Sequence, residues 1–475
     1  MSLRFGVVGA AAALLPLSPA LAQEAQSAPA DTAALLQRLE ETEQRLRVLE
    51  RQLELDKEAA KAAAESAATV RASPTRFSIG TSDGANFIRL RGVLQADGRH
   101  FENDGSPATS NTWLLRRVRP ILEGTLAGIY DFRFTPDFAG GKTVIQDAYI
   151  TARFRPWAQV TVGKFKVPVG LERIQSATDI RFIERAFPTS LVPNRDLGVQ
   201  LGGQLAEGAF SYNISYTNGV TDGGSTESNV NPDGESDAKG DVSARVFFQP
   251  FLNSDHFALR GLGFGIGGTY VDSTGSPTNT LLPSYRTPGQ ASFFSYRSNT
   301  STTDNNATFA DGKRLRYSPQ FYYYYNNLGV LGEYAVVSQD VTRVNGATTR
   351  SDTLDHKAWQ LQFTWLLTGE DESFRGVTPA NNFNVGKPGR GAWELVARVH
   401  ELRLDDATFE GGVDSFANPL TAARKAQAAG IGVNWYLNPN VRWSVNYEQT
   451  RFDGGAASGD RPDEKVFLTR VGLAF

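Results

Sequence analysis

From about residue 76 to its end, the chain alternates apolar and polar side chains with a period of two. Clusters of Gly, Asn, Asp, Ser and Pro separate the alternating runs, a pattern typical of strands joined by turns. The runs predict sixteen strands, at 87–101, 113–126, 130–138, 144–155, 159–166, 197–204, 209–216, 241–250, 257–270, 314–325, 329–338, 357–367, 391–404, 425–436, 441–452 and 466–475. Because this number is even, the first and last strands of a closed barrel would place both chain ends on the same, periplasmic side of the membrane. We therefore expect an all-β fold, a 16-stranded antiparallel β-barrel over 76–475, with 76–81 unassigned.

One face of most predicted strands is continuously apolar. Trp359, Leu361, Phe363, Trp365 and Leu367 form one such stripe. These faces suit lipid, since Trp and Tyr concentrate at membrane interfaces. The last run, VFLTRVGLAF, ends on Phe475 and resembles the closing strand of bacterial outer-membrane proteins. We expect a transmembrane barrel in contact with outer-membrane lipid of a Gram-negative bacterium.

The first 22 residues are typical of a signal peptide. Arg4 supplies the positive start, 5–17 form an apolar core, and Ala20-Leu21-Ala22 is a small-x-small cleavage site. That apolar core is too short to cross a bilayer as a helix. The chain also has no cysteine, which excludes a disulfide framework and thiolate chemistry.

Residues 23–75 form a separate region with helical periodicity. Leu35, Leu39, Leu46, Leu49 and Leu53 follow a spacing of four and three residues, typical of heptads. About three heptads predict a periplasmic coiled coil attached to an oligomer, and the alternative is a single helical spacer. Ser73-Pro74 marks the boundary with the barrel.

The connections between strands alternate in length. Short ones at 127–129, 155–157, 206–208, 326–328 and 438–440 are predicted periplasmic turns, and long polar ones at 167–196, 217–240, 271–313, 339–356 and 405–424 are predicted to lie outside. The segment 368–390 breaks this alternation because it is long and falls on the side of the short turns. It is either a true insertion or a slip in the strand count.

The strand faces opposite the apolar stripes carry many arginines. Alternation places Arg99 and nine candidate site residues toward the lumen, the nine being Arg89, Arg91, Arg117, Arg119, Arg133, Arg153, Arg245, Arg314 and Arg316. One interpretation is structural, since arginine–carboxylate pairs across strands contribute roughly 0.2–1 kcal/mol each to a barrel wall. The inward arginines outnumber the inward acids, which favours an unpaired surplus of positive charge.

The long connection 167–196 is too apolar for a loop in solvent. It contains Ile174, Ile180, Phe182, Ile183 and Phe187, and we expect it to fold into the barrel and narrow it. An outer lid or a contact between trimer subunits is the alternative. Five further candidate cations lie in or just before this segment: Lys164, Lys166, Arg173, Arg181 and Arg185.

Arginine is well matched to phosphate. Its guanidinium stays charged, is weakly hydrated and offers a planar fork of donors to two oxygens. Several such sites in series allow an ion to be passed along, because conduction requires both binding and release. We therefore expect an outer-membrane channel for anions, either phosphate or polyphosphate, and interpret the fourteen basic residues as candidate anion-binding and pore-lining positions.

Two segments, LLRRVRPILEGTLAGIYDFRFTPDFAGGKTVIQDAYI and VTVGKFKVPVGLERIQSATDIRFIERAFPTSLVPNRDLGVQLGG, resemble the phosphate-selective porin O and P family. WLLTGEDE and GAWELVARV resemble the C-terminal half of that family. The resemblance covers the barrel and is most specific over 114–203. It implies a trimer of sixteen-stranded barrels, a constricting third loop and an arginine ladder that guides anions to a central site. By matching segment, Arg117, Arg119, Arg133, Lys164 and the arginines of 173–195 would take part.

Other function classes have less support in the sequence. The formal net charge of −3 gives no electrostatic basis for nucleic-acid binding. The four histidines, His100, His256, His356 and His400, lie in no nucleophile motif and no metal-ligand spacing, so we expect no enzyme activity, metal or cofactor.

Two alternatives stay open. A general or carbohydrate-type diffusion porin would lack strong anion preference, and the tyrosines of 322–325 could stack on sugars. In a structural role, the helical region would trimerise and tether the membrane to the cell wall, with the pore secondary.

Overall fold

The computed structural model describes residues 29–73, 76–102, 110–226, 239–299 and 306–475. The expected signal peptide, 1–22, lies outside the described residues. The chain divides into two compact units, Met1–Ala67 and Ala68–Phe475, which are described separately below.

The first unit contains one long helix, α1 (Pro29–Ser66). Its composition of Ala, Leu, Glu, Gln, Lys and Arg favours helix throughout. The leucines of the predicted heptads, Leu35, Leu39, Leu46, Leu49 and Leu53, are each 57–64% exposed along it. None of the helices in the described ranges combines the length and apolar character needed to cross a bilayer.

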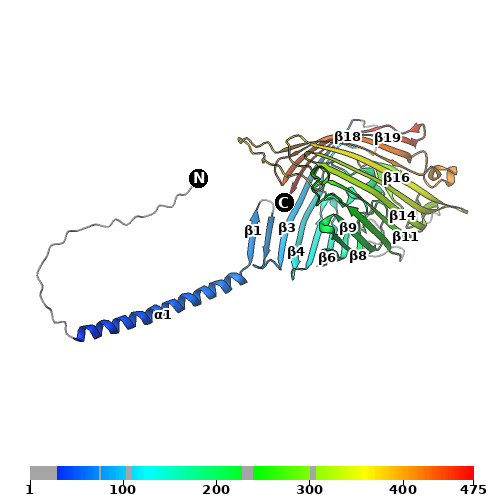
Figure 1. The fold of residues 1–475 in the computed structure, drawn as a ribbon. Coiled ribbons are helices and arrows are strands. Elements are labelled where there is room, and N and C mark those ends of the chain that lie inside the picture. The colour runs from blue at the N-terminus through cyan, green and yellow to red at the C-terminus, as the bar shows by residue number, and fades with distance from the viewer. Residues whose placement is uncertain (1–28, 74–75, 103–109, 227–238, 300–305) are drawn as a thin grey trace. The chain divides into compact units, whose positions relative to one another are not determined.

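The second unit contains a closed barrel of sixteen antiparallel strands, which confirms the predicted fold class (Figure 1). The short strands β1 (Thr69–Ser73), β2 (Arg76–Gly80) and β20 (Gly459–Asp460) pair with the same sheet. Each strand pairs with the next, and β21 returns to β3 with the register Val466↔Phe101 to Ala474↔Val93. The strands are β3 (Phe87–Phe101), β4 (Thr112–Leu126), β5 (Tyr130–Asp137), β6 (Val144–Arg155), β7 (Ala158–Lys166), β8 (Arg195–Leu205), β9 (Phe210–Thr217), β10 (Asp241–Phe248), β11 (Leu262–Thr274), β14 (Asn306–Tyr325), β15 (Leu328–Asn345), β16 (Thr348–Leu366), β17 (Ala392–Arg403), β18 (Ala423–Tyr436), β19 (Val441–Ala456) and β21 (Glu464–Ala474).

The predicted loop at 339–356 is wrong. Strands β15 and β16 continue through it and meet at a two-residue turn closed by the pair Asn345↔Thr348. Gly346 has a φ of +60° at the first central position of this turn, where glycine is favoured. The sequence pattern fails because these strand ends carry polar residues on both faces, so the apolar stripe stops before the strands do.

Other boundaries also differ from expectation. The strand predicted at 257–270 begins at Leu262, after a short 3-10 helix at Phe257–Leu259. The long connection after it contains a hairpin of β12 (Ser284–Arg286) and β13 (Ser292–Ser295). The unassigned 76–81 contains β2 (Arg76–Gly80), which pairs with both β1 (Thr69–Ser73) and β3.

The segment 368–390 is a true insertion between β16 and β17, and the strand count holds. It lies at the barrel end that carries the short turns, called below the short-turn end; the opposite end is the long-loop end. The amide of Glu372 donates to the carbonyl of Asn326 in one short turn, and the amide of Phe383 donates to the carbonyl of Leu437 beside another.

The two faces of each strand differ as alternation predicts. On β16, Leu361, Phe363 and Trp365 are 43–45% exposed on the outside. Their inward neighbours, among them Gln360 and Gln362, are buried within the barrel. Near the short-turn end, Trp393 stacks on Trp435 with ring centroids 5.0 Å apart. This arrangement matches an apolar band bordered by interfacial aromatics.

Replacing Leu361 by arginine should destabilise the barrel, because this position lies within the apolar band and away from the interfacial Trp365. Arginine near the middle of the bilayer costs about 2–4 kcal/mol, whereas near an interface it costs about 0–1 kcal/mol. Urea titration of the protein folded in lipid vesicles would measure the difference. Leu367→Arg, at the edge of the same stripe, is the matched control, and an equal loss in both variants would contradict the assigned depth.

Candidate functional site

The connection between β7 and β8 fills part of the barrel interior. This segment, residues 167–194, is called below the lumen loop and contains the short helix α2 (Leu171–Ile174) and a 3-10 turn at Phe187–Ser190. Its apolar residues are buried, among them Phe182, Ile183 and Phe187.

Polar groups on the inner barrel wall bind the backbone of the lumen loop. The carboxylate of Glu333 on β15 accepts the amides of Leu171 at 2.8 Å and Glu172 at 3.2 Å. The side-chain oxygen of Asn446 on β19 accepts the amide of Ile183 at 2.8 Å. Because buried backbone groups need hydrogen-bond partners, these contacts fix where the loop lies.

Two buried arginines complete the attachment. Arg470 on β21 donates to the carbonyl of Ile183 at 2.6 Å and pairs with Asp97 across the barrel seam. Arg398 on β17 donates to the carbonyl of Glu184 at 3.0 Å and lies 4.2 Å from the ring centre of Phe182. These arginines therefore hold the loop and are themselves enclosed.

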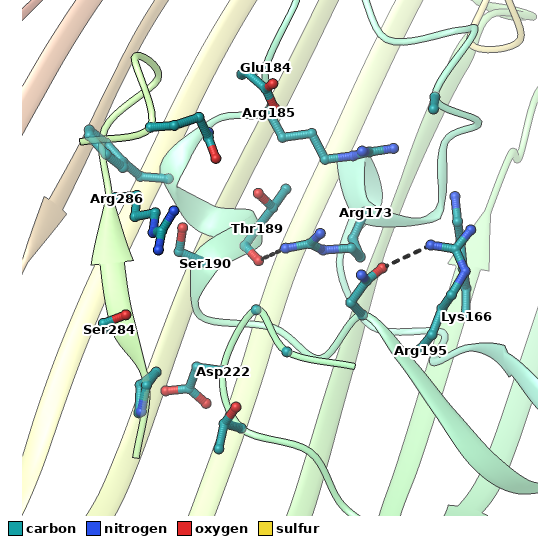
Figure 2. Close-up of a pocket in the computed structure, with 18 of the residues that line it drawn as sticks. Lys166, Arg173, Glu184, Arg185, Thr189, Ser190, Arg195, Asp222, Ser284 and Arg286 are labelled. Carbon is teal, nitrogen blue, oxygen red and sulfur yellow. Dashed lines mark hydrogen bonds between the residues drawn. The ribbon is translucent and has the colours of Figure 1, made fainter. Parts of the chain in front are cut away.

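A cavity of about 520 Å³ lies beside the lumen loop (Figure 2). Residues of the long connections 221–224 and 282–290 border it, so it opens toward the long-loop end, and it is called below the main cavity. Two carboxylates line it, those of Glu184 and Asp222. Eight cationic side chains line it: Arg116, Arg117, Arg119, Lys166, Arg173, Arg185, Arg195 and Arg286.

Three of these cations are paired with carboxylates. Arg116 pairs with Glu184 at 2.7 Å, and the other two pairs are Arg119–Asp137 and Arg195–Asp147. Both carboxylates that line the cavity are therefore paired: Glu184 with Arg116, and Asp222 with Arg316 of the barrel wall at 2.6 Å.

The other five cations have no carboxylate within 4.0 Å in the described part of the chain: Arg117, Lys166, Arg173, Arg185 and Arg286. Arg173 and Arg185 donate only to backbone carbonyls of the lumen loop. Burial lowers the pKa of Arg173 to about 9, and the neighbouring guanidinium of Arg185 acts in the same direction. Both groups stay charged at neutral pH, so the main cavity carries a local surplus of positive charge.

Two further cavities continue the cationic lining toward the short-turn end. The middle cavity, of about 490 Å³, shares Arg119, Lys166 and Arg195 with the main cavity and adds Arg91 and Arg133. The end cavity, of about 390 Å³, shares Arg91 with the middle one and adds Arg89, Arg375 and Arg442. The short turn at 438–440 borders this last cavity. Positive side chains therefore follow one another along the interior.

The predicted site residues divide into two groups. Eight line at least one of the three cavities: Arg89, Arg91, Arg117, Arg119, Arg133, Lys166, Arg173 and Arg185. The other six do not line them: Arg153, Lys164, Arg181, Arg245, Arg314 and Arg316.

Most of that second group is enclosed in the barrel wall. Arg316 is fully buried between Asp222 and Asp241 and donates to the carbonyl of Val220. Arg245 donates to the side chain of Gln320. Arg181 belongs to the lumen loop, where it is buried and pairs with Glu394 of the wall at 2.7 Å. Alternation along a strand shows which face a side chain takes. It does not show whether a carboxylate from a distant segment covers that side chain.

Sequence reasoning missed Arg116. The register between β3 and β4 passes from Gln95↔Arg117 to Ala96↔Leu115, so Arg116 is the extra residue of a bulge. Both adjacent arginines therefore face inward, whereas strict alternation assigns Arg116 to lipid. The sequence did contain a signal for the bulge: Arg116 and Arg117 are adjacent, and strict alternation would turn one of the two charged side chains toward lipid. Arg286 and Arg375 lie in long connections, where no periodic pattern predicts orientation.

Comparison with known proteins gives a consistent result. The family model described as phosphate-selective porin O and P matches residues 88–475. Porin O of Pseudomonas aeruginosa is 22% identical over 418 residues, which cover 84% of this chain and 90% of that protein.

Solved structures show the same fold at low sequence identity. The outer-membrane channel DcaP of Acinetobacter baumannii aligns with a TM-score of 0.52 and 12% identity, over 83% of this chain and 99% of that one. OmpF of Salmonella typhi, in complex with daunomycin, aligns with a TM-score of 0.50 and 11% identity, again over 83% and 99%.

Replacing Glu333 by alanine should release the lumen loop near α2. Two buried amides and the hydroxyl of Ser318 would lose their acceptor, and each unsatisfied buried donor costs about 1–3 kcal/mol. Hydrogen exchange at residues 170–174 should rise by roughly tenfold or more. Glu333→Gln keeps one acceptor oxygen and should raise exchange less. Unchanged exchange in the alanine variant would show that Glu333 does not anchor the loop.

Proposed function

This chain belongs to the phosphate-selective porin O and P family, and we propose that this outer-membrane porin selects anions and carries phosphate past the cations of the lumen loop. The family and the barrel fold point to a channel rather than an enzyme. The observation that carries the proposal is the set of five cations in the main cavity that have no carboxylate of the described residues within 4.0 Å.

These cations suit phosphate for a physical reason. Arg173 and Arg185 keep guanidinium donors in a partly enclosed space, with no carboxylate of the described residues within 4.0 Å of them. An anion 4 Å from one such group gains about 4 kcal/mol at an effective dielectric of 20. A planar fork also matches two phosphate oxygens better than it matches the spherical chloride ion.

Transport requires release as well as binding. The main, middle and end cavities share cations at their borders, so the binding positions for an anion would follow one another along the interior. A series of similar sites avoids a single deep trap. The lumen loop would then act as the constriction, because it borders both cavities: Arg173 and Arg185 line the main cavity, and Ser176 and Thr178 line the middle one.

We further place the N-terminal region in the periplasm and the long-loop end outside the cell. The even strand number supports this orientation, since both ends of the barrel domain leave from one side. The leucine stripe of α1 supports a homotrimer, because its exposed residues recur with the spacing of a coiled coil.

Current measurements in a planar lipid bilayer test the proposal. A zero-current potential across a chloride gradient should show anion preference, and added phosphate should block the chloride current. Arg173→Gln and Arg185→Gln should each raise the half-blocking phosphate concentration about tenfold, a change of about 1.4 kcal/mol.

Arg260→Ala is the matched control, because Arg260 lies in a turn outside the three cavities and carries the same charge. It should leave the phosphate block unchanged. Anion preference without block would reduce the proposal to a broader anion channel. Weak or cation preference would instead support a general or carbohydrate-type diffusion porin.

A further inference from the structure

The main cavity has a second kind of lining besides its cations. Eight neutral side chains that can form hydrogen bonds border it, among them Ser190, Ser284 and Gln290. Figure 2 shows Ser190, Ser284 and Arg286 on one side and Arg173, Lys166 and Arg195 on the other. The cavity therefore has a cationic wall and an opposite wall of mainly neutral polar groups, which also carries Arg286 and is called below the neutral wall.

The hydroxyl groups of the neutral wall differ in availability. Thr287 donates to the carboxylate of Glu464 at 2.9 Å, and Thr189 donates to the carbonyl of Ala186 at 2.8 Å. The hydroxyls of Ser190 and Ser284 have no protein partner in the ranges that the structure describes. These two groups are thus free to bind a solute.

The neutral wall is held in place by packing. Its outer part is the β12–β13 hairpin, in which Tyr285 stacks on Phe294 with centroids 5.4 Å apart. Phe293 of the hairpin contacts Phe187 of the lumen loop at 5.7 Å between centroids, and the Tyr285 hydroxyl donates to Asp222 at 3.1 Å. The hairpin therefore presents Ser284 from a fixed position.

The size of the main cavity indicates more than a bare ion. Its volume of about 520 Å³ lies within the range of roughly 300–1,000 Å³ typical of small organic ligands. An inorganic phosphate on Arg173 and Arg185 would leave the neutral wall without a partner. A solute with an anionic group at one end and hydroxyls at the other would use both walls.

We infer that the main cavity binds a hydroxylated organic phosphate. The phosphate group lies on the cationic wall at Arg173 and Arg185, and the hydroxyl-bearing part lies against Ser190, Ser284 and Gln290. This inference rests on the proposed anion channel and names the class of solute that its main cavity prefers.

Block of the chloride current by four probes tests the inference in the wild-type channel. Glucose 6-phosphate should block at about one-tenth of the concentration that inorganic phosphate requires, since it adds at least two hydrogen bonds. Glucose, which lacks the anionic group, should not block at the same concentrations. Pyrophosphate, which has charge at both ends and no hydroxyl-rich part, should block less tightly than glucose 6-phosphate.

The double variant Ser190→Ala with Ser284→Ala should raise the half-blocking concentration of glucose 6-phosphate about tenfold. Its advantage over inorganic phosphate should then nearly disappear. Ser295→Ala is the matched control, because Ser295 pairs with Ser284 in the same hairpin but does not line the cavity. It should leave the ratio of the two half-blocking concentrations unchanged.

Three outcomes overturn the inference while the anion channel stands. They are equal block by glucose 6-phosphate and inorganic phosphate, tighter block by pyrophosphate than by glucose 6-phosphate, and an unchanged ratio in the double serine variant. If none of the phosphates blocks, the inference and the proposed phosphate selectivity fail together.

Discussion

The interior of this barrel depends on hydrogen bonds between the inner wall and the backbone of one loop. A loop cannot enter a barrel unless its amides and carbonyls find partners there, since buried unsatisfied groups are costly. Glu333, Asn446, Arg398 and Arg470 supply such partners from four different strands. Because the loop is held this way, its own cations have fixed positions, and the interior becomes separate cavities rather than one wide opening.

Arginine has two distinct roles in this interior, and the position of the nearest carboxylate decides which one a residue takes. Arg316 is enclosed by two aspartates and stabilises the wall. Within the part of the chain that the structure describes, Arg173 and Arg185 donate hydrogen bonds only to carbonyls, which orient a guanidinium without neutralising it. Carbonyl partners thus keep a cation in place while leaving its charge available to a solute.

The sequence predicts the barrel well because side chains that face lipid must be apolar, which produces a regular stripe on the outer face of each strand. Where the apolar stripe ends, prediction weakens: the ends of β15 and β16 carry polar residues on both faces, so the sequence pattern indicated a loop where the two strands continue to their turn. The bulge at Arg116 and the burial of Arg316 depend on register and on segments distant in sequence. Those features are set by tertiary structure, so alternation could identify inward arginines but not separate solute-facing ones from those that brace the wall.

The attachment of the lumen loop also has a consequence for the order of assembly. Ile183 binds Asn446 and Arg470, which follow it by 263 and 287 residues, and Arg470 lies on the strand that closes the barrel against β3. Arg116 on β4 precedes the loop and pairs with Glu184, but the contacts of Ile183 cannot form until the last strands arrive. In a partly inserted chain, the sheet would therefore still be open, and the arginines of the lumen loop would not yet have fixed positions. Selectivity would emerge only at closure, in the same late step that seals the barrel.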